Sequence, residues 1–257
     1  MPDATLQLRN LKGIWRPVYA RRLALHATAD AIVIAAWRAD LHGIDLAPAV
    51  AAWRQAIGET VDPATQRRRQ AAAAAILGAL AARNWRRTRA ALATAAKHAH
   101  RAGWAAGHAI VTQDAADDTD YDEPADSPYR IGSPDMTDHT ADATAGAVLS
   151  AALRASANRV GRAMADSEDD PEGEAEDVLG AGLDLELADD VAVSAAYGAG
   201  MLAAYLGAGA QAVVWMTAGD ARVCNLCEDN ETDSPYSLLG APSLPAHARC
   251  RCCLAPA

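Results

Sequence analysis

The chain ends in two cysteine-bearing stretches, which read Cys224-Asn225-Leu226-Cys227 and His247-Ala248-Arg249-Cys250-Arg251-Cys252-Cys253. They hold all five cysteines of the 257-residue chain, and 19 residues separate them. Two ligands held two residues apart can face the same ion, and a second pair completes a tetrahedron around it. These stretches therefore predict that the end of the chain folds around one metal site.

The residue types in these stretches indicate which metal and which ligands to expect. Thiolates combined with imidazole form the closed ligand sets that zinc prefers when it stabilises a fold. We expect structural Zn²⁺ bound by four side chains, namely Cys224, Cys227, His247 and Cys250. Cys252 competes for a place in this set, since either sulfur of the Cys-Arg-Cys segment could be presented, and the choice between His247 and Cys252 stays open. Cys253 is interpreted as a spare thiol.

Disulfides and a catalytic metal are the alternatives to this site. An odd number of cysteines and the lack of a recognisable signal peptide favour reduced thiols. A catalytic zinc keeps a ligand position open, and zinc deaminases carry an H-x-E motif, whereas His247 is followed by Ala248 and Arg249. The sequence shows no Ser-His-Asp set, Gly-rich phosphate loop or paired acid motif. We therefore expect a protein that is not an enzyme.

The residues beside the cysteines form a longer pattern. Residues 213–217 are apolar and largely β-branched, which predicts a short strand that leads towards Cys224. From Trp215 the chain reads W-x-T-x-x-D-x-R-x-C-x-x-C, and from Pro245 it reads P-x-H-x-x-C-R-C. This pattern resembles the C-terminal domain of the phage Mu F-like minor head proteins, the phage head morphogenesis family. The matching residues are Trp215, Thr217, Asp220, Arg222, Cys224, Cys227, Pro245, His247, Cys250, Arg251 and Cys252.

The resemblance covers residues 212–256, and no family motif is found in residues 1–140. Members of the family commonly carry a Leu-Asp-Gly turn soon after the second cysteine. This chain instead has Glu228-Asp229-Asn230-Glu231-Thr232, with no glycine before Gly240. The departure concerns the segment between the ligand pairs and leaves the pairs themselves in place.

The resemblance implies a structural minor protein of a tailed-phage head, which acts in head morphogenesis and in DNA packaging or ejection. It implies the portal protein and the capsid interior as partners, with packaged double-stranded DNA as a further one. It also implies a location inside the virion head, and in the host cytoplasm during assembly. A zinc-stabilised nucleic-acid enzyme or toxin of phage origin is the alternative. A host zinc-binding DNA regulator is a third class, which the acidic surroundings of the cysteines disfavour.

Charge divides the chain into a basic and an acidic part. Residues 1–113 contain 16 Lys/Arg and 6 Asp/Glu, whereas residues 114–257 contain 7 and 27. A basic helical face could contact DNA phosphates. We favour the simpler interpretation that this face is solvated and pairs with acidic segments of the chain or of a partner. No apolar run is long enough to cross a bilayer, so we expect no membrane partner.

Composition and periodicity predict a mainly α fold, with an N-terminal helical region and a small C-terminal α+β module stabilised by zinc. Alanine supplies much of the 51% hydrophobic content and phenylalanine is absent, so the core should rely on close helix–helix approach and on tryptophan. The expected helices are 19–41, 47–57, 63–108 with a break near Gly78 or Asn84, 143–165 and 191–206. The expected domains are a basic helical region (1–113), an acidic linker (114–142), Ala-rich helices (143–210) and the zinc module (211–257).

Overall fold

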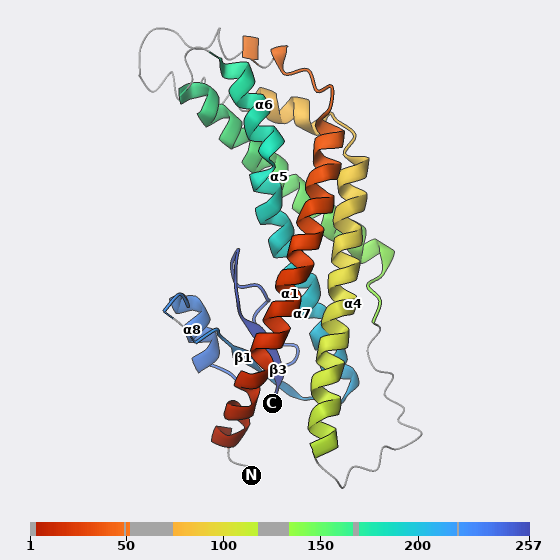
Figure 1. Ribbon diagram of the computed structural model, residues 1–257, viewed down its shortest axis with the longest axis vertical. Coiled ribbons are helices and arrows are strands. Elements are labelled where there is room, and N and C mark those ends of the chain that lie inside the picture. Colours follow the sequence, from red (N-terminus) through yellow and green to blue (C-terminus); the bar gives the residue numbers. More distant parts are fainter. Residues whose placement is uncertain (1–3, 49, 52–73, 118–133, 167–169, 220) are drawn as a thin grey trace. The chain divides into compact units, whose positions relative to one another are not determined.

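A computed structural model describes residues 4–48, 50–51, 74–117, 134–166, 170–219 and 221–257. The described residues are mainly helical, with a small three-stranded sheet near the C-terminus, which confirms the predicted fold class (Figure 1). Residues 47–48, 50–51 and 74–81 are also helical. The named elements are helices α1 (Ala4–Leu41), α4 (Arg86–Asp117), α5 (Asp138–Asp166), α6 (Pro171–Ala181), α7 (Leu183–Gly207) and α8 (Asn225–Thr232), and strands β1 (Ala212–Met216), β2 (Tyr236–Ser237) and β3 (Cys253–Pro256).

Contacts divide the chain into two compact units, each assembled from separate segments. Unit 1 comprises residues 1–29, 94–141 and 190–257, and unit 2 comprises residues 30–93 and 142–189. The long helices α1, α4 and α7 each contribute one part to each unit. The division of the sequence at residues 113, 142 and 210 follows composition and charge, and it stays a prediction.

In unit 1, helices α4 and α7 approach each other at glycines. A Cβ atom added to Gly103 would lie 2.0 Å from the carbonyl oxygen of Tyr197, and one added to Gly200 would lie 2.0 Å from that of His100. Real Cβ atoms do not come so near to backbone oxygens, so only glycine fits at these two positions. The alanine- and glycine-rich sequence thus achieves the close helix approach that its composition predicts.

Gly200→Ala is therefore expected to lower the free energy of unfolding by about 1–3 kcal/mol, because backbone atoms of α4 must move away from the new methyl group. Gly180→Ala in α6 is the matched control, since a Cβ atom there meets nothing within 4 Å. It should be neutral or stabilising by up to about 1 kcal/mol. Urea denaturation of both variants measures the difference, and equal effects would contradict the backbone-to-backbone contact.

The core of unit 2 contains a tryptophan pair. The rings of Trp37 and Trp85 stack with centroids 4.5 Å apart. The indole N–H of Trp37 donates to the carbonyl of Leu179 at 2.7 Å, and that of Trp85 donates to the carbonyl of Leu80 at 2.6 Å. The second bond satisfies a carbonyl where helix 74–81 ends, so the predicted break near Asn84 is confirmed, whereas Gly78 lies within the helix.

The buried face of α1 combines apolar and polar residues. Two of the helix's large apolar side chains, Leu23 and Ile32, are 48% and 54% exposed. The buried face instead follows Val18, Arg22, His26, Ala29, Val33, Trp37 and Asp40. Three of these side chains are polar or charged, and each has hydrogen-bond or ionic partners that make burial tolerable. A search for apolar residues alone would therefore identify only part of this face.

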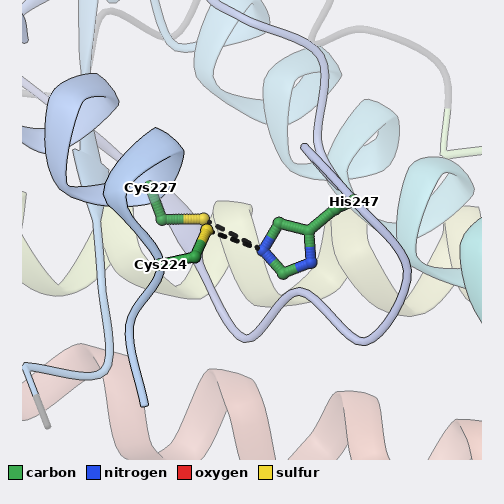
Figure 2. Close-up of side chains that lie close together, drawn as sticks. All are labelled: Cys224, Cys227 and His247. Carbon is green, nitrogen blue, oxygen red and sulfur yellow. Dashed lines mark hydrogen bonds between the residues drawn. The ribbon is translucent and has the colours of Figure 1, made fainter. Parts of the chain in front are cut away.

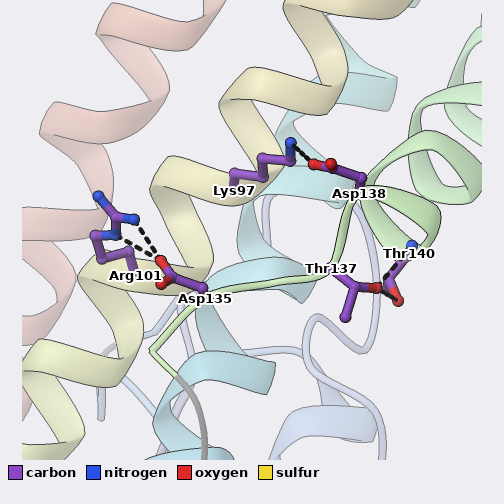
Figure 3. A network of polar contacts seen from close by, with 6 residues as sticks. All are labelled: Lys97, Arg101, Asp135, Thr137, Asp138 and Thr140. Atoms are coloured by element: carbon purple, nitrogen blue, oxygen red, sulfur yellow. Dashed lines mark hydrogen bonds and ion pairs between the residues drawn. The ribbon is translucent and has the colours of Figure 1, made fainter.

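The acidic segments are more helical than expected. Helix α4 continues to Asp117 and α5 begins at Asp138, so both ends of the expected linker 114–142 are helical, while residues 118–133 lie outside the described part. Thr137 accepts a hydrogen bond from the Thr140 backbone at the start of α5 (Figure 3). Asp138 pairs there with Lys97, and Arg101 pairs with Asp135.

The acidic residues 170–190, which lie between the expected helices 143–165 and 191–206, also form helices. Pro171 begins α6, and the Asp170 side chain caps that helix by accepting from the Gly173 N–H at 2.9 Å. Gly182, with φ 67°, ends it, and α7 begins at once. Acids are favourable in first helical turns, and proline fits the first helical position. The helix expected at 191–206 therefore starts eight residues earlier.

The sheet has the order β2-β1-β3, and both pairings are antiparallel. β1 lies one residue before the expected strand 213–217. The hydroxyl of Tyr205 in α7 donates to the carbonyl of Leu254 in β3 at 2.9 Å, which fixes the strand against unit 1's helical core. Within the described residues, no helix is long and apolar enough to cross a membrane.

Candidate metal centre

Helix α8 delivers the first pair of cysteines. Cys224 is the N-cap residue and Cys227 lies in the first turn, where backbone N–H groups and the helix dipole favour a thiolate. The segment 228–232, where the sequence departs from the Mu F-like pattern, continues this helix instead of forming a loop. Glu231 in α8 accepts hydrogen bonds from the backbone and hydroxyl of Thr217, at 3.1 and 2.8 Å. This contact ties the ligand helix to the end of β1.

His247 faces the first cysteine pair. Its Nε2 atom lies 3.2 Å from the sulfur of Cys224 and 3.3 Å from the sulfur of Cys227 (Figure 2). Its other ring nitrogen, Nδ1, lies 2.8 Å from the carbonyl of Ala248. A carbonyl only accepts, so Nδ1 carries a proton, and in a neutral ring the lone pair is then on Nε2, which faces the two sulfurs. This is the tautomer that a metal ligand requires.

Three cysteines form a second group. The ligand atoms of Cys227, Cys250 and Cys252 lie within 4.8 Å of one another, as do those of Cys224, Cys227 and His247. The sulfurs of Cys227 and Cys250 are 3.9 Å apart. Cys227 belongs to both groups and joins them. The structure thus brings together all five residues selected from the sequence, and these side chains could hold a metal ion.

Hydrogen bonds within the cluster separate the cysteines into thiolates and thiols. The Cys252 side chain donates to Cys250 and lowers the pKa of Cys250 to about 5, while it raises the pKa of Cys252. A backbone N–H of Cys227 lowers the pKa of Cys224. Burial raises the pKa of Cys227 to about 12. Cys250 is therefore the strongest metal-free thiolate of the second group, and Cys252 is its hydrogen-bond donor.

The cluster is held from outside by residues that sequence analysis missed. The guanidinium of Arg22 in α1 donates to the carbonyls of Cys250 and Cys252, at 2.5 and 2.8 Å. Asp190 in α7 accepts from the backbone N–H of Arg249 at 2.9 Å, and Arg249 has a left-handed φ of 59°. Both contacts join segments far apart in the chain, so no local sequence pattern indicated them.

A Ser-His-Asp series is present, contrary to the sequence analysis. His26 Nδ1 lies 3.2 Å from Asp190, and His26 Nε2 lies 3.2 Å from the hydroxyl of Ser194. The three residues are separated in the chain order His, Asp, Ser, which is why no motif revealed them. Ser194 is only 2% exposed, and burial lowers the pKa of His26. In this conformation the series connects α1 to α7 and to the Arg249 turn, and substrate has no access to the serine.

The other residues selected from the sequence differ in their burial. Trp215 is buried in β1, and Cys253 is buried in β3, where its pKa is raised to about 12 by burial. Arg222 is exposed, and Asp220 lies outside the described residues. The cysteines are free of disulfides, as expected.

The donor set fits zinc better than the hard cations magnesium or calcium, which bind oxygen ligands. Two tetrahedral thiolates at about 2.3 Å from zinc have sulfurs about 3.8 Å apart, and Cys227 and Cys250 already have this separation. The ring of His247 is oriented to supply a nitrogen ligand. No family model, curated protein or solved structure matches this chain.

Proposed function

We propose that residues 211–257 fold around one structural Zn²⁺, bound by the four side chains Cys224, Cys227, His247 and Cys250. The orientation of His247 Nε2 towards two sulfurs supports its place in the set. The 3.9 Å separation between the sulfurs of Cys227 and Cys250 supports Cys250, and Cys252, which donates to Cys250, is the competing ligand. A closed set of four ligands leaves no position for a substrate, which supports a structural rather than a catalytic ion.

We further propose that the protein is a structural minor head protein of a tailed phage, which contacts the portal and the capsid interior. The single observation that carries this proposal is the pattern from Trp215 to Cys252. Its separated parts form one site, with Thr217 held by the ligand helix through Glu231. Zinc would stabilise a terminal segment that has little core of its own.

The basic residues favour pairing within the chain over a role in binding DNA. Lys97 and Arg101 pair with Asp138 and Asp135 (Figure 3). Arg89 lies 3.5 Å from the carbonyl of Asp142. Arg83 donates to the carbonyls of residues 40, 42 and 43, at the end of α1. Contacts with packaged DNA would have to come from the remaining basic side chains. The portal and the capsid interior are therefore the proposed main partners.

A head protein should be found in the particle. Mass spectrometry of virions purified from the host culture is expected to detect peptides from both the basic and the acidic parts of the chain. Particles from which free proteins have been removed by density-gradient sedimentation provide the control. Detection of the chain in the host cytoplasm alone, with none in the particles, would contradict the proposal.

A further inference from the structure

Arg22 is a buried cation whose direct hydrogen bonds are made to the metal cluster. The residue is 3% exposed and lies in α1, 228 residues away from Cys250 in the chain. Its two terminal nitrogens donate to two carbonyls, those of Cys250 and Cys252, and its guanidinium lies 5.3 Å from the ring centre of Tyr19. The side chain thus holds both ends of the Cys250-Arg251-Cys252 turn from a different part of unit 1.

Within the part of the chain that the structure describes, the guanidinium of Arg22 is bonded to carbonyl oxygens and to no carboxylate. Among the described residues, the ion pairs join His26 to Asp190, Lys97 to Asp138, Arg101 to Asp135 and Arg159 to Asp184, and none includes Arg22. Carbonyl groups satisfy its N–H donors but carry no net charge. A buried charge is costly, so a further negative group close to Arg22 would stabilise the core.

A zinc centre would supply that charge. One Zn²⁺ with three thiolates and one neutral imidazole has a net charge of −1, which balances one guanidinium. The carbonyls that Arg22 holds belong to the backbone of a ligand and of its hydrogen-bond donor, so the cation contacts the turn that carries Cys250. This argument rests on the proposed structural zinc.

We propose that Arg22 is a positioning residue of the metal centre, which orients the Cys250–Cys252 turn and neutralises the charge of the zinc–thiolate group. The first helix is then part of the metal-binding unit, and residues 211–257 alone lack one of its components. Asp190 has a related role on the neighbouring residue, because it fixes the N–H of Arg249 in its left-handed conformation. His26, one turn after Arg22, orients Asp190.

Zinc affinity of the full chain tests this role. We expect Arg22→Met to raise the zinc dissociation constant by about 10- to 100-fold, the effect usual for groups that orient metal ligands. Arg22→Lys keeps the charge but cannot bind two carbonyls with a planar fork, so it should recover part of the loss. Arg21→Met is the matched control, because it removes the same charge from the adjacent, exposed side chain. Competition with a chromophoric zinc chelator measures all four dissociation constants.

Thermal melting of the zinc-loaded and metal-free chains separates this role from simple packing. If Arg22 acts through the metal centre, Arg22→Met reduces the rise in melting temperature that zinc produces, and Arg21→Met leaves that rise unchanged. Two results would overturn the role of Arg22 while leaving the proposed zinc centre intact. One is an equal zinc affinity for wild type and Arg22→Met, and the other is an equal loss of stability in Arg22→Met with and without zinc. If Arg22→Met does not fold, an unchanged zinc affinity of Arg22→Lys would overturn it. A wild-type chain that binds no zinc would overturn the proposed centre as well.

Discussion

Replacement of Cys227 by alanine is expected to abolish zinc binding and to unfold the C-terminal residues 211–257. Cys227 is the one ligand that belongs to both three-residue groups, so its loss leaves neither group complete. Structural zinc in small finger domains contributes about 10–16 kcal/mol of apparent binding free energy, which is more than a short segment can lose and stay folded. The zinc content should fall from about one ion per chain to none. Elemental analysis and limited proteolysis measure the two effects.

Cys253→Ala is the matched control for this experiment. Cys253 is also a buried cysteine of the same segment, but it lies in β3 and in neither ligand group. It should keep its zinc and lose stability only through the small cavity left by one sulfur. If Cys227→Ala retained zinc, or if both variants lost it equally, the assignment of Cys227 as the shared ligand would be wrong.

Replacement of Trp37 by alanine is expected to have the largest effect on unit 2. The side chain is fully buried, stacks on Trp85 and donates its indole N–H to the carbonyl of Leu179. Truncation of a buried tryptophan leaves a large cavity, and here it also leaves a carbonyl without its donor. The free energy of unfolding should fall by about 3–5 kcal/mol. Urea denaturation followed by circular dichroism measures the change.

Ile32→Ala provides the comparison, because Ile32 lies on the same helix but is 54% exposed. Its effect should stay within about 0.5 kcal/mol, as is usual for surface positions. A similar loss for both variants would show that the buried face of α1 is not the one that contains Trp37. The zinc content of both variants should stay at the wild-type value, since neither side chain touches the cluster.

The parts that could be predicted from the sequence are those determined by local chemistry. The spacing of Cys224, Cys227, His247 and Cys250 was sufficient to select residues that the structure brings together, since ligands two residues apart meet in a turn. β-branched residues located β1, and alanine-rich periodicity located the long helices. A helical break was expected at Gly78 or Asn84, two poor helix formers, and the structure has it near Asn84.

The parts that were missed depend on contacts between distant segments. Arg22 contacts Cys250 across 228 residues, and nothing near Arg22 in the sequence indicates that partner. Asp190 and Ser194 were assigned to an acidic stretch and an Ala-rich helix, because only the folded chain brings His26 to them. Helix α8 was missed because the comparison with the Mu F-like turn suggested a loop. Helix α6 and the start of α7 were missed because their sequences are strongly acidic. Acidic residues in a first helical turn nevertheless favour the helix, and both helices have them there.

The most direct test of the metal centre is X-ray absorption at the zinc edge of the full chain, purified without added metal. The expected result is one zinc per chain with three sulfur ligands at about 2.3 Å and one nitrogen ligand at about 2.0–2.1 Å. A chain that contains no zinc, or a zinc surrounded mainly by oxygen ligands, would contradict the proposed centre.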